Sequence, residues 1–179
     1  MAFHGIVNTT AMMCTNVDAL NMVGVYATAD IDNGTLVTLD KIAKTAAGDI
    51  TGYQYEVKPA AANAVNVWLV ATPEVGKTLD MQIHDDIRYF YNKAGLPMDI
   101  KALVAGFDCF EVDATAFANG TLPTNAQIGQ LCAVAANGKF AAPAASVASG
   151  ATFRVEGLHT ITCGADEVKT AVLRCMKNA

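Results

Sequence analysis

The stretch IDNGTLVTLDKIAK, residues 31–44, decides the fold class of this chain. Asn33-Gly34 is a turn pair of the kind that joins β-strands, and an apolar, β-branched run follows it. A second stretch, IGQLCAVAANGKF at residues 128–140, has the same order: a glycine-containing entry, an apolar run and a turn pair at Asn137-Gly138. We interpret both stretches as the beginnings of β-hairpins.

The segments between these two stretches also have the patterns of β-strands. GYQYEVKPA, residues 52–60, alternates between apolar and polar side chains, as a strand with one buried face does. AVNVWLVATP, residues 64–73, is a continuous apolar run, which is typical of a strand buried on both faces. KALVAGFDCFEVDATAF, residues 101–117, reads as two strands broken at Ala105-Gly106. Short strands at this spacing indicate a barrel or sandwich rather than β-α-β units.

We therefore expect a mainly β protein with one or two small barrel-like or sandwich-like units. Its expected parts are an extended N-terminal arm, a first β unit, an aromatic-rich connecting segment with short strands, and a second β unit: residues 1–20, 21–76, 77–120 and 121–179. The last part repeats the element order of the first unit, with Gly34–Val37 matching Gly129–Cys132. An internal duplication and an unrelated pair of similar units both explain this order.

The middle segment, residues 80–94, fits either a short helix or a strand or irregular loop. Asp80 is a suitable helix N-cap, and apolar residues follow it at helical spacing: Met81, Ile83, Ile87 and Phe90. In a strand, the residues on one face would instead be Ile87, Tyr89 and Tyr91. Gly95 and Pro97 end either element.

Composition excludes several classes of function. The chain has 179 residues, of which 53% are hydrophobic and only 16% charged, and its net charge is −5. An acidic chain without a Lys/Arg cluster lacks the electrostatic signature of a nucleic-acid binder or a membrane-surface binder. No apolar run approaches the roughly 20 residues of a membrane span, and the first residues do not form a signal peptide. We expect synthesis in a cytoplasm and a surface that is partly used for partners.

Little in the sequence indicates catalysis. The five cysteines are scattered without a CxxC pair, so we expect reduced thiols, no metal site and no cofactor. Only two serines occur, and there is no GxSxG motif. The best acid–base cluster consists of His84, Asp85, Asp86 and Arg88. Such a cluster is either a catalytic group or a solvated or interfacial set of ion pairs, and we expect the second, with no enzymatic activity.

Four motifs occur in an order that resembles a known family. They are an aromatic F-x-N-x-A-G segment, a short strand pair around a glycine, a hairpin with an Asn-Gly turn, and a closing F-R-V…T strand: Phe90–Gly95, Leu103–Val112, Gly129–Phe140 and Phe153–Thr160. In this order they resemble the capsid decoration proteins of tailed bacteriophages, which are also called head-stabilising or cement proteins. The resemblance covers about 85 residues well and the remainder loosely.

The resemblance implies a structural virion protein without enzymatic activity, made in the cytoplasm of a bacterial host. Its partner would be the lattice of the major capsid protein, which it would bind on the outer surface of the head, and it would be a homo-oligomer, a trimer or dimer. An N-terminal arm can add a strand to a neighbouring subunit by edge pairing, although a disordered start explains the same sequence. The candidate capsid or subunit contacts are Phe3, Ile6, Met12, Met13, Tyr89, Phe90 and Tyr91.

Two alternatives remain open. A phage tail-tube or head–tail connector protein would form rings or stacked hexamers. A small hydrolase or ligand-binding β-barrel would use the cluster around His84, and substitution of Asp85 would then abolish an activity or a ligand.

Overall fold

A computed structural model describes residues 3–74, 86–163 and 166–179, and they form a mainly β fold, as the sequence predicts. The strands are β1 (Val7–Asn8), β2 (Asn21–Val25), β3 (Leu36–Lys44), β4 (Ile50–Pro59), β5 (Trp68–Val70), β6 (Pro97–Ala102), β7 (Cys109–Val112), β8 (Leu131–Ala133), β9 (Thr152–Cys163) and β10 (Asp166–Lys177). Short 3-10 helices lie between them: η1 (Met13–Thr15), η2 (Asp18–Leu20), η3 (Ile87–Tyr89), η4 (Ala114–Ala116), η5 (Asn125–Gln127) and η6 (Ala136–Gly138).

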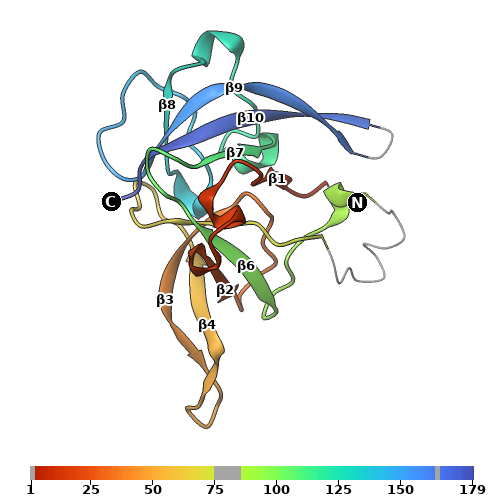
Figure 1. Cartoon of the computed structure of the whole chain (residues 1–179), viewed down its shortest axis with the longest axis vertical. Coiled ribbons are helices and arrows are strands. Elements are labelled where there is room, and N and C mark those ends of the chain that lie inside the picture. Colours follow the sequence, from red (N-terminus) through yellow and green to blue (C-terminus); the bar gives the residue numbers. More distant parts are fainter. Residues whose placement is uncertain (1–2, 75–85, 164–165) are drawn as a thin grey trace.

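The strands form two sheets, which Figure 1 shows one above the other. Five strands close a barrel in the order β2-β4-β3-β5-β6, because β2 pairs with both β4 and β6. The other sheet has the order β1-β7-β10-β9-β8 and is antiparallel throughout. The expectation of small barrel-like units is therefore confirmed for the first sheet, whereas the second sheet is open.

The pairing of β3 with β5 lies between two hydrophobic cores. Leu36 of β3 is opposite Leu69 of β5, and both side chains are fully buried in the larger core. The next residues, Val37 and Val70, are fully buried in the smaller core inside the barrel. This arrangement explains the continuous apolar run at residues 64–73, because a strand between two cores buries both of its faces.

The larger core is centred on phenylalanines that come from three different elements of the chain. Phe140 and Phe153 meet edge to face with ring centroids 5.0 Å apart, and Phe110 lies 5.9 Å from Phe153. All three rings are at most 1% exposed. Aromatic rings at such distances and angles stabilise a core beyond the area that they bury, and here they join β7 and β9 to the loop after β8.

The two stretches that decide the fold class contact each other. Asn137 and Gly138 both have positive φ angles, 59° and 68°, so they form the turn that the sequence predicts. The Gly138 N–H donates to the carbonyl of Ala60, and a Cβ at position 138 would lie 2.1 Å from the carbonyl oxygen of Leu36. Only glycine allows this close approach, which packs the turn of the second stretch on the first strand residue of the other.

The strand pairing differs from the sequence interpretation at one place. β2 precedes the turn at Asn33-Gly34, but it pairs with β4 and β6 and not with β3. Ile31 instead forms a bridge with Asn92. The long hairpins are β3–β4 and β9–β10. In the barrel, β3 lies between β4 and β5. The sequence match pairs β3 with β8, but β8 is the edge strand of the second sheet, and β9 lies between two strands there. This difference supports two unrelated units with similar hairpins over an internal duplication.

The strands of the expected connecting segment, residues 77–120, belong to both sheets: β6 closes the barrel and β7 lies in the second sheet. In the N-terminal arm, residues 1–20, β1 pairs with β7 of the same chain. Residues 75–85 lie outside the described part, and with them lie Asp80, Met81, Ile83, His84 and Asp85. Of residues 80–94, the described part contains one short 3-10 helix, η3, whose N-cap Asp86 accepts a hydrogen bond from the backbone N–H of Arg88.

A comparison of two glycines tests the contact between the two stretches. Gly106 and Gly138 both have positive φ, but a Cβ at Gly106 would meet no atom within 4 Å. We expect Gly106→Ala to cost about 1 kcal/mol of unfolding free energy, the conformational penalty alone. Gly138→Ala should cost at least about 2 kcal/mol more, because its Cβ meets backbone. Denaturant unfolding of both variants measures this difference, and equal losses would contradict the contact.

Candidate functional site

The N-terminal segment, residues 3–8, contains the edge strand β1 of the second sheet and passes close to the turn that precedes β3 of the barrel. Val7 and Asn8 pair with Val112 and Glu111 of β7, and Ile6 is only 3% exposed. A Cβ at Gly5 would lie 2.3 Å from the carbonyl oxygen of Asn33, so the chain passes very close to the turn before β3. The segment is therefore fixed within its own chain.

Aromatic side chains gather at the start of this segment, and we call them, together with Arg88, the N-terminal aromatic surface: Phe3, His4, Arg88, Tyr89 and Tyr91. The Phe3 and Tyr89 rings lie 5.4 Å apart, and the His4 and Tyr91 rings 4.8 Å apart. The guanidinium of Arg88 lies 4.4 Å from the centre of the Phe3 ring, within the range of a cation–π contact. Phe3 nevertheless remains 54% exposed.

Arg88 holds this surface to the tip of the β9–β10 hairpin. Its guanidinium donates to both carboxylate oxygens of Asp86 and, at 2.6 Å, to Asp166 at the start of β10. Hydrogen bonds to Asp86 and Asp166 raise the pKa of Arg88 above its ordinary value. A planar guanidinium can bind two carboxylates in fixed directions, so Arg88 connects η3, β10 and the N-terminal segment through one side chain.

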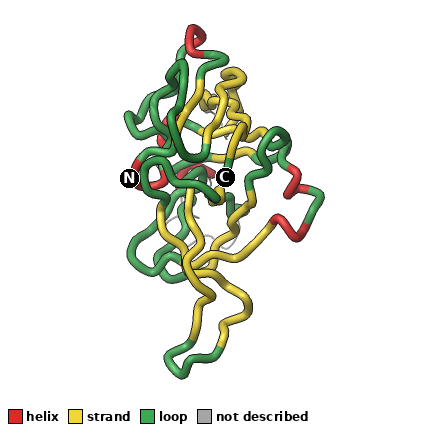
Figure 2. The backbone as a smooth tube through the Cα atoms, turned by 90° about the vertical axis from the view of Figure 1, so that its left-hand side faces the viewer, coloured by secondary structure: helices red, strands yellow, loops and turns green. Residues whose placement is uncertain are grey.

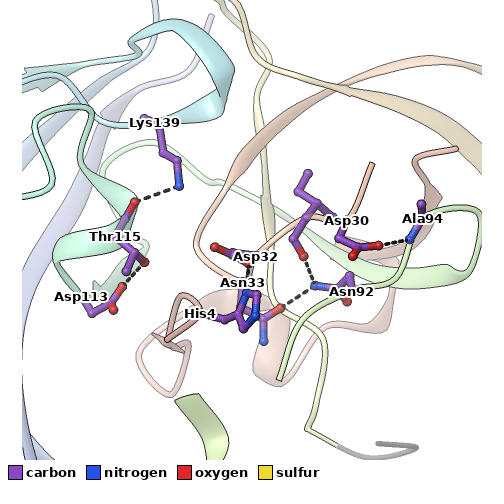
Figure 3. Close-up of polar contacts among 10 residues, drawn as sticks. His4, Asp30, Asp32, Asn33, Asn92, Ala94, Asp113, Thr115 and Lys139 are labelled. Atoms are coloured by element: carbon purple, nitrogen blue, oxygen red, sulfur yellow. Dashed lines mark hydrogen bonds and ion pairs between the residues drawn. The ribbon is translucent and has the colours of Figure 1, made fainter. Parts of the chain in front are cut away.

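Behind the aromatic surface lies a polar cluster, shown in Figure 3. His4 Nδ1 lies 2.8 Å from Asp32 Oδ1. The buried Asn33 pairs through its amide with both backbone groups of Thr72, at 2.9 and 3.0 Å. Asn92, also buried, donates to Asn33 Oδ1 and to the carbonyl of Ile31. These bonds satisfy buried amides and join the turn before β3 to Thr72 and Asn92.

Asp113 is the buried carboxyl group of this region. It is 7% exposed, and it accepts a hydrogen bond of 2.7 Å from the Thr115 hydroxyl. Burial raises the pKa of Asp113, hydrogen bonds from Thr115 and from the backbone of Ile6 lower it in part, and the nearby Asp32 raises it. The Thr115 hydroxyl and Asp32 both lie close to Gly5, since a Cβ there would be 3.0 Å from Thr115 Oγ1 and 3.2 Å from Asp32 Cβ, so the cluster packs against the N-terminal segment.

The raised pKa of Asp113 predicts a specific pH dependence. A carboxyl group whose pKa is higher in the folded state than in the unfolded state stabilises the fold at low pH. The protein loses this contribution to its stability as pH rises from 3.8, the ordinary value, through the raised pKa. In Asp113→Asn this loss is absent. We therefore expect the melting temperature of the variant, relative to the native chain, to increase with pH across this window and then level off. A pH-independent difference between the two melting temperatures would contradict the assignment.

The structure separates the candidate contact residues of the sequence analysis into two groups. Phe3 and Met13 are exposed, and Tyr89 and Tyr91 are half-buried. Three side chains are at most 5% exposed and pack inside this chain, so they are not available as surface contacts: Ile6, Met12 and Phe90. An aromatic or apolar residue in a segment without periodicity can serve either purpose, and only the tertiary packing decides between them.

Of the predicted contacts, the structure brings Phe3, Tyr89 and Tyr91 together on one surface. Met13 is elsewhere, where its N–H donates to the buried Asp108. Sequence reasoning missed the partners that build the surface, above all Asp166, which is 78 residues from Arg88. No local pattern could have indicated this pair.

The acid–base cluster of the sequence analysis is only partly within the described residues. His84 and Asp85 lie outside them, and Asp86 is bound to Arg88. No group of three His, Cys, Asp or Glu side chains that could hold a metal occurs in the described ranges. Burial raises the pKa of Cys132 and of Cys175 to about 12, which makes these thiols poor nucleophiles at neutral pH.

An open groove of about 370 Å³ lies between residues 9–18 and strands β2 and β6. Its charged side chains are Asp18, Asp99 and Lys101, and Lys101 donates to the Asn21 amide at 2.7 Å. Within the described residues, no helix has the length and apolar character needed to cross a membrane.

Comparison with known proteins finds no matching family model, no matching curated protein and no matching solved structure.

Proposed function

We propose that this chain is a structural protein of a tailed bacteriophage particle, which binds the outer surface of the capsid and stabilises the expanded head. The sequence resemblance suggests this class, and the mainly β fold is compatible with it. The single observation that carries the proposal is the N-terminal aromatic surface, where Arg88 contacts Phe3 and the Phe3 residue remains 54% exposed.

The composition of this surface is suited to binding a protein. Aromatic side chains and arginine dominate the binding energy of protein interfaces, and a surface that is already ordered loses little entropy on binding. Phe3, Arg88 and Tyr89 are ordered by their mutual contacts and by the ion pair with Asp166. A capsid-binding protein needs such a surface and a rigid scaffold, and it needs no catalytic group.

The proposed stabilisation of the head follows from mass action. A protein that binds the assembled lattice and not the free capsid subunits lowers the free energy of the assembled state by its own binding free energy. The effect grows with the number of copies bound. Such a protein would be located in the virion after synthesis in the host cytoplasm, with the major capsid protein as its partner.

One observation favours the alternative of a tail-tube or head–tail connector protein. The β3–β4 hairpin projects away from the rest of the molecule in Figure 2, and its far end exposes Ile50 (54%) and Tyr53 (76%). A projecting hairpin can reach a neighbouring subunit in a ring. Rings or stacked hexamers in electron micrographs of the purified protein would support this alternative.

Co-sedimentation with phage heads that lack this protein tests the proposal. We expect saturable binding to expanded heads, a higher melting temperature of the bound shell, and no binding to precursor heads. Phe3→Ala should weaken binding about 30-fold, which corresponds to a loss of about 2 kcal/mol at an interface hot spot.

Phe107→Ala is the matched control, because Phe107 is 69% exposed but lies elsewhere. The backbone N–H of the neighbouring Gly106 donates to the carbonyl of Cys175. Cys175 and Asp166 are nine residues apart in β10, or about 30 Å along an extended strand, and Asp166 lies at the aromatic surface. This control should bind like the native chain. Absence of binding to both kinds of head would overturn the proposal, and equal losses in the two variants would exclude the aromatic surface as the contact.

A further inference from the structure

The β9–β10 hairpin continues beyond the other strands of its sheet. β8 pairs with β9 only at Thr152–Arg154, and β7 pairs with β10 only at Ala171–Arg174. β9 itself runs on to Cys163. Within the described residues, no strand pairs with the outer edge of β9 from Gly157 to Cys163. Figure 1 shows this part of the hairpin extending toward the side where the N-terminus lies.

A register shift marks the start of the free edge. Val172 and Leu173 of β10 pair with Gly157 and Val155, so Glu156 is an extra residue in β9. The carboxylate of Glu156 accepts hydrogen bonds from Arg154 and Arg174. Burial raises the pKa of Glu156, but these two guanidinium groups outweigh it and hold the pKa below its ordinary value. The last charged side chain of β9 is thereby fixed before the free edge begins.

Other strand edges of this chain are protected against pairing with another molecule. The barrel is closed, β1 has two residues and β8 has three. The β3–β4 hairpin carries charged side chains along its strands, among them Asp40, Lys41, Lys44 and Lys58. Short strands, closure and lysines are the usual means by which proteins prevent edge-to-edge association.

The free edge of β9 has none of these protections. Its sequence from Gly157 to Thr162 is GLHTIT, which contains no Lys, Arg, Asp, Glu or Pro. Leu158, His159, Thr160 and Thr162 are exposed, so side chains on both faces of the strand are accessible. Thr and Ile favour the extended conformation, and the backbone is already held extended by β10.

We propose that this edge pairs with the same edge of a second copy of the chain, antiparallel about a two-fold axis at Thr160. The two five-stranded sheets would then form one continuous sheet of ten strands. The register about this axis places Thr160 opposite Thr160 of the second copy, and Leu158 opposite Thr162. The free edge spans seven residues, or about 23 Å.

The chemistry of the edge selects a second copy as the partner. A two-fold axis brings each side chain near its own equivalent, so a charged edge would repel itself. The edge has no acidic or basic side chain besides His159, so it is complementary to itself. Threonine pairs directly opposite each other are among the favourable cross-strand pairs. This inference does not depend on the proposed capsid function, because it concerns the free protein.

Sedimentation equilibrium of the full chain tests the inference. We expect a monomer–dimer equilibrium for the native chain and at least about fivefold weaker dimerisation for Thr160→Glu, which places two carboxylates opposite each other. Within one chain the new carboxylate faces Lys169, its partner in β10, so the hairpin itself should keep its stability. The matched control is Ala46→Glu, which adds the same charge at the exposed β3–β4 turn and should dimerise like the native chain.

Thr160→Cys provides an independent readout of the register. We expect a disulfide-linked dimer under mild oxidation, and no such dimer with Ala46→Cys, which controls for the five native thiols. A native chain that is monomeric at all concentrations overturns the inference. It is also overturned if Thr160→Glu dimerises as strongly as the native chain, because another surface then joins the copies. Capsid co-sedimentation is a separate measurement, so either proposal can fail alone.

Discussion

The pairing of β3 with β5 is the constraint on which the rest of the structure depends. Leu36 and Leu69 face the phenylalanine-rich core of the open sheet, and Val37 and Val70 face the interior of the barrel. One pair of strands therefore supplies side chains to both cores. A polar side chain on either face would leave an unsatisfied group in a dry core, so the sequence around these residues has to be apolar without alternation.

The same strand pair positions the candidate functional surface. The buried amide of Asn33 lies just before β3 and binds Thr72 just after β5, and Gly5 passes against the Asn33 carbonyl. The N-terminal segment is thereby fixed at the junction of the two sheets, and Phe3 is held at the surface, where Arg88 contacts it. Exposure of an ordered aromatic ring at this place is a consequence of how the two cores are joined.

Features that depend on neighbouring residues could be predicted from the sequence, and features that depend on distant ones could not. The mainly β class, the turns at Asn33-Gly34 and Asn137-Gly138 and the strand buried on both faces each follow from local patterns. Prediction of the parallel pairing of β2 with β4 would have required knowledge of which distant strands are neighbours in the sheet. The aromatic residues of the candidate site could be named as contact candidates, but their assembly depends on the Arg88–Asp166 pair, and the burial of Ile6 depends on β7.

The central claim is that one strand pair joins both cores into a single cooperative unit. Trp68 is the only tryptophan of the chain and lies on β5 at the barrel core, so its fluorescence reports on the barrel. Hydrogen exchange of the β9 and β10 amides reports on the open sheet. Both should be followed across one denaturant titration. The account predicts coincident transitions with the same midpoint. A barrel transition separated from that of the open sheet would show that the cores fold independently and would contradict the account.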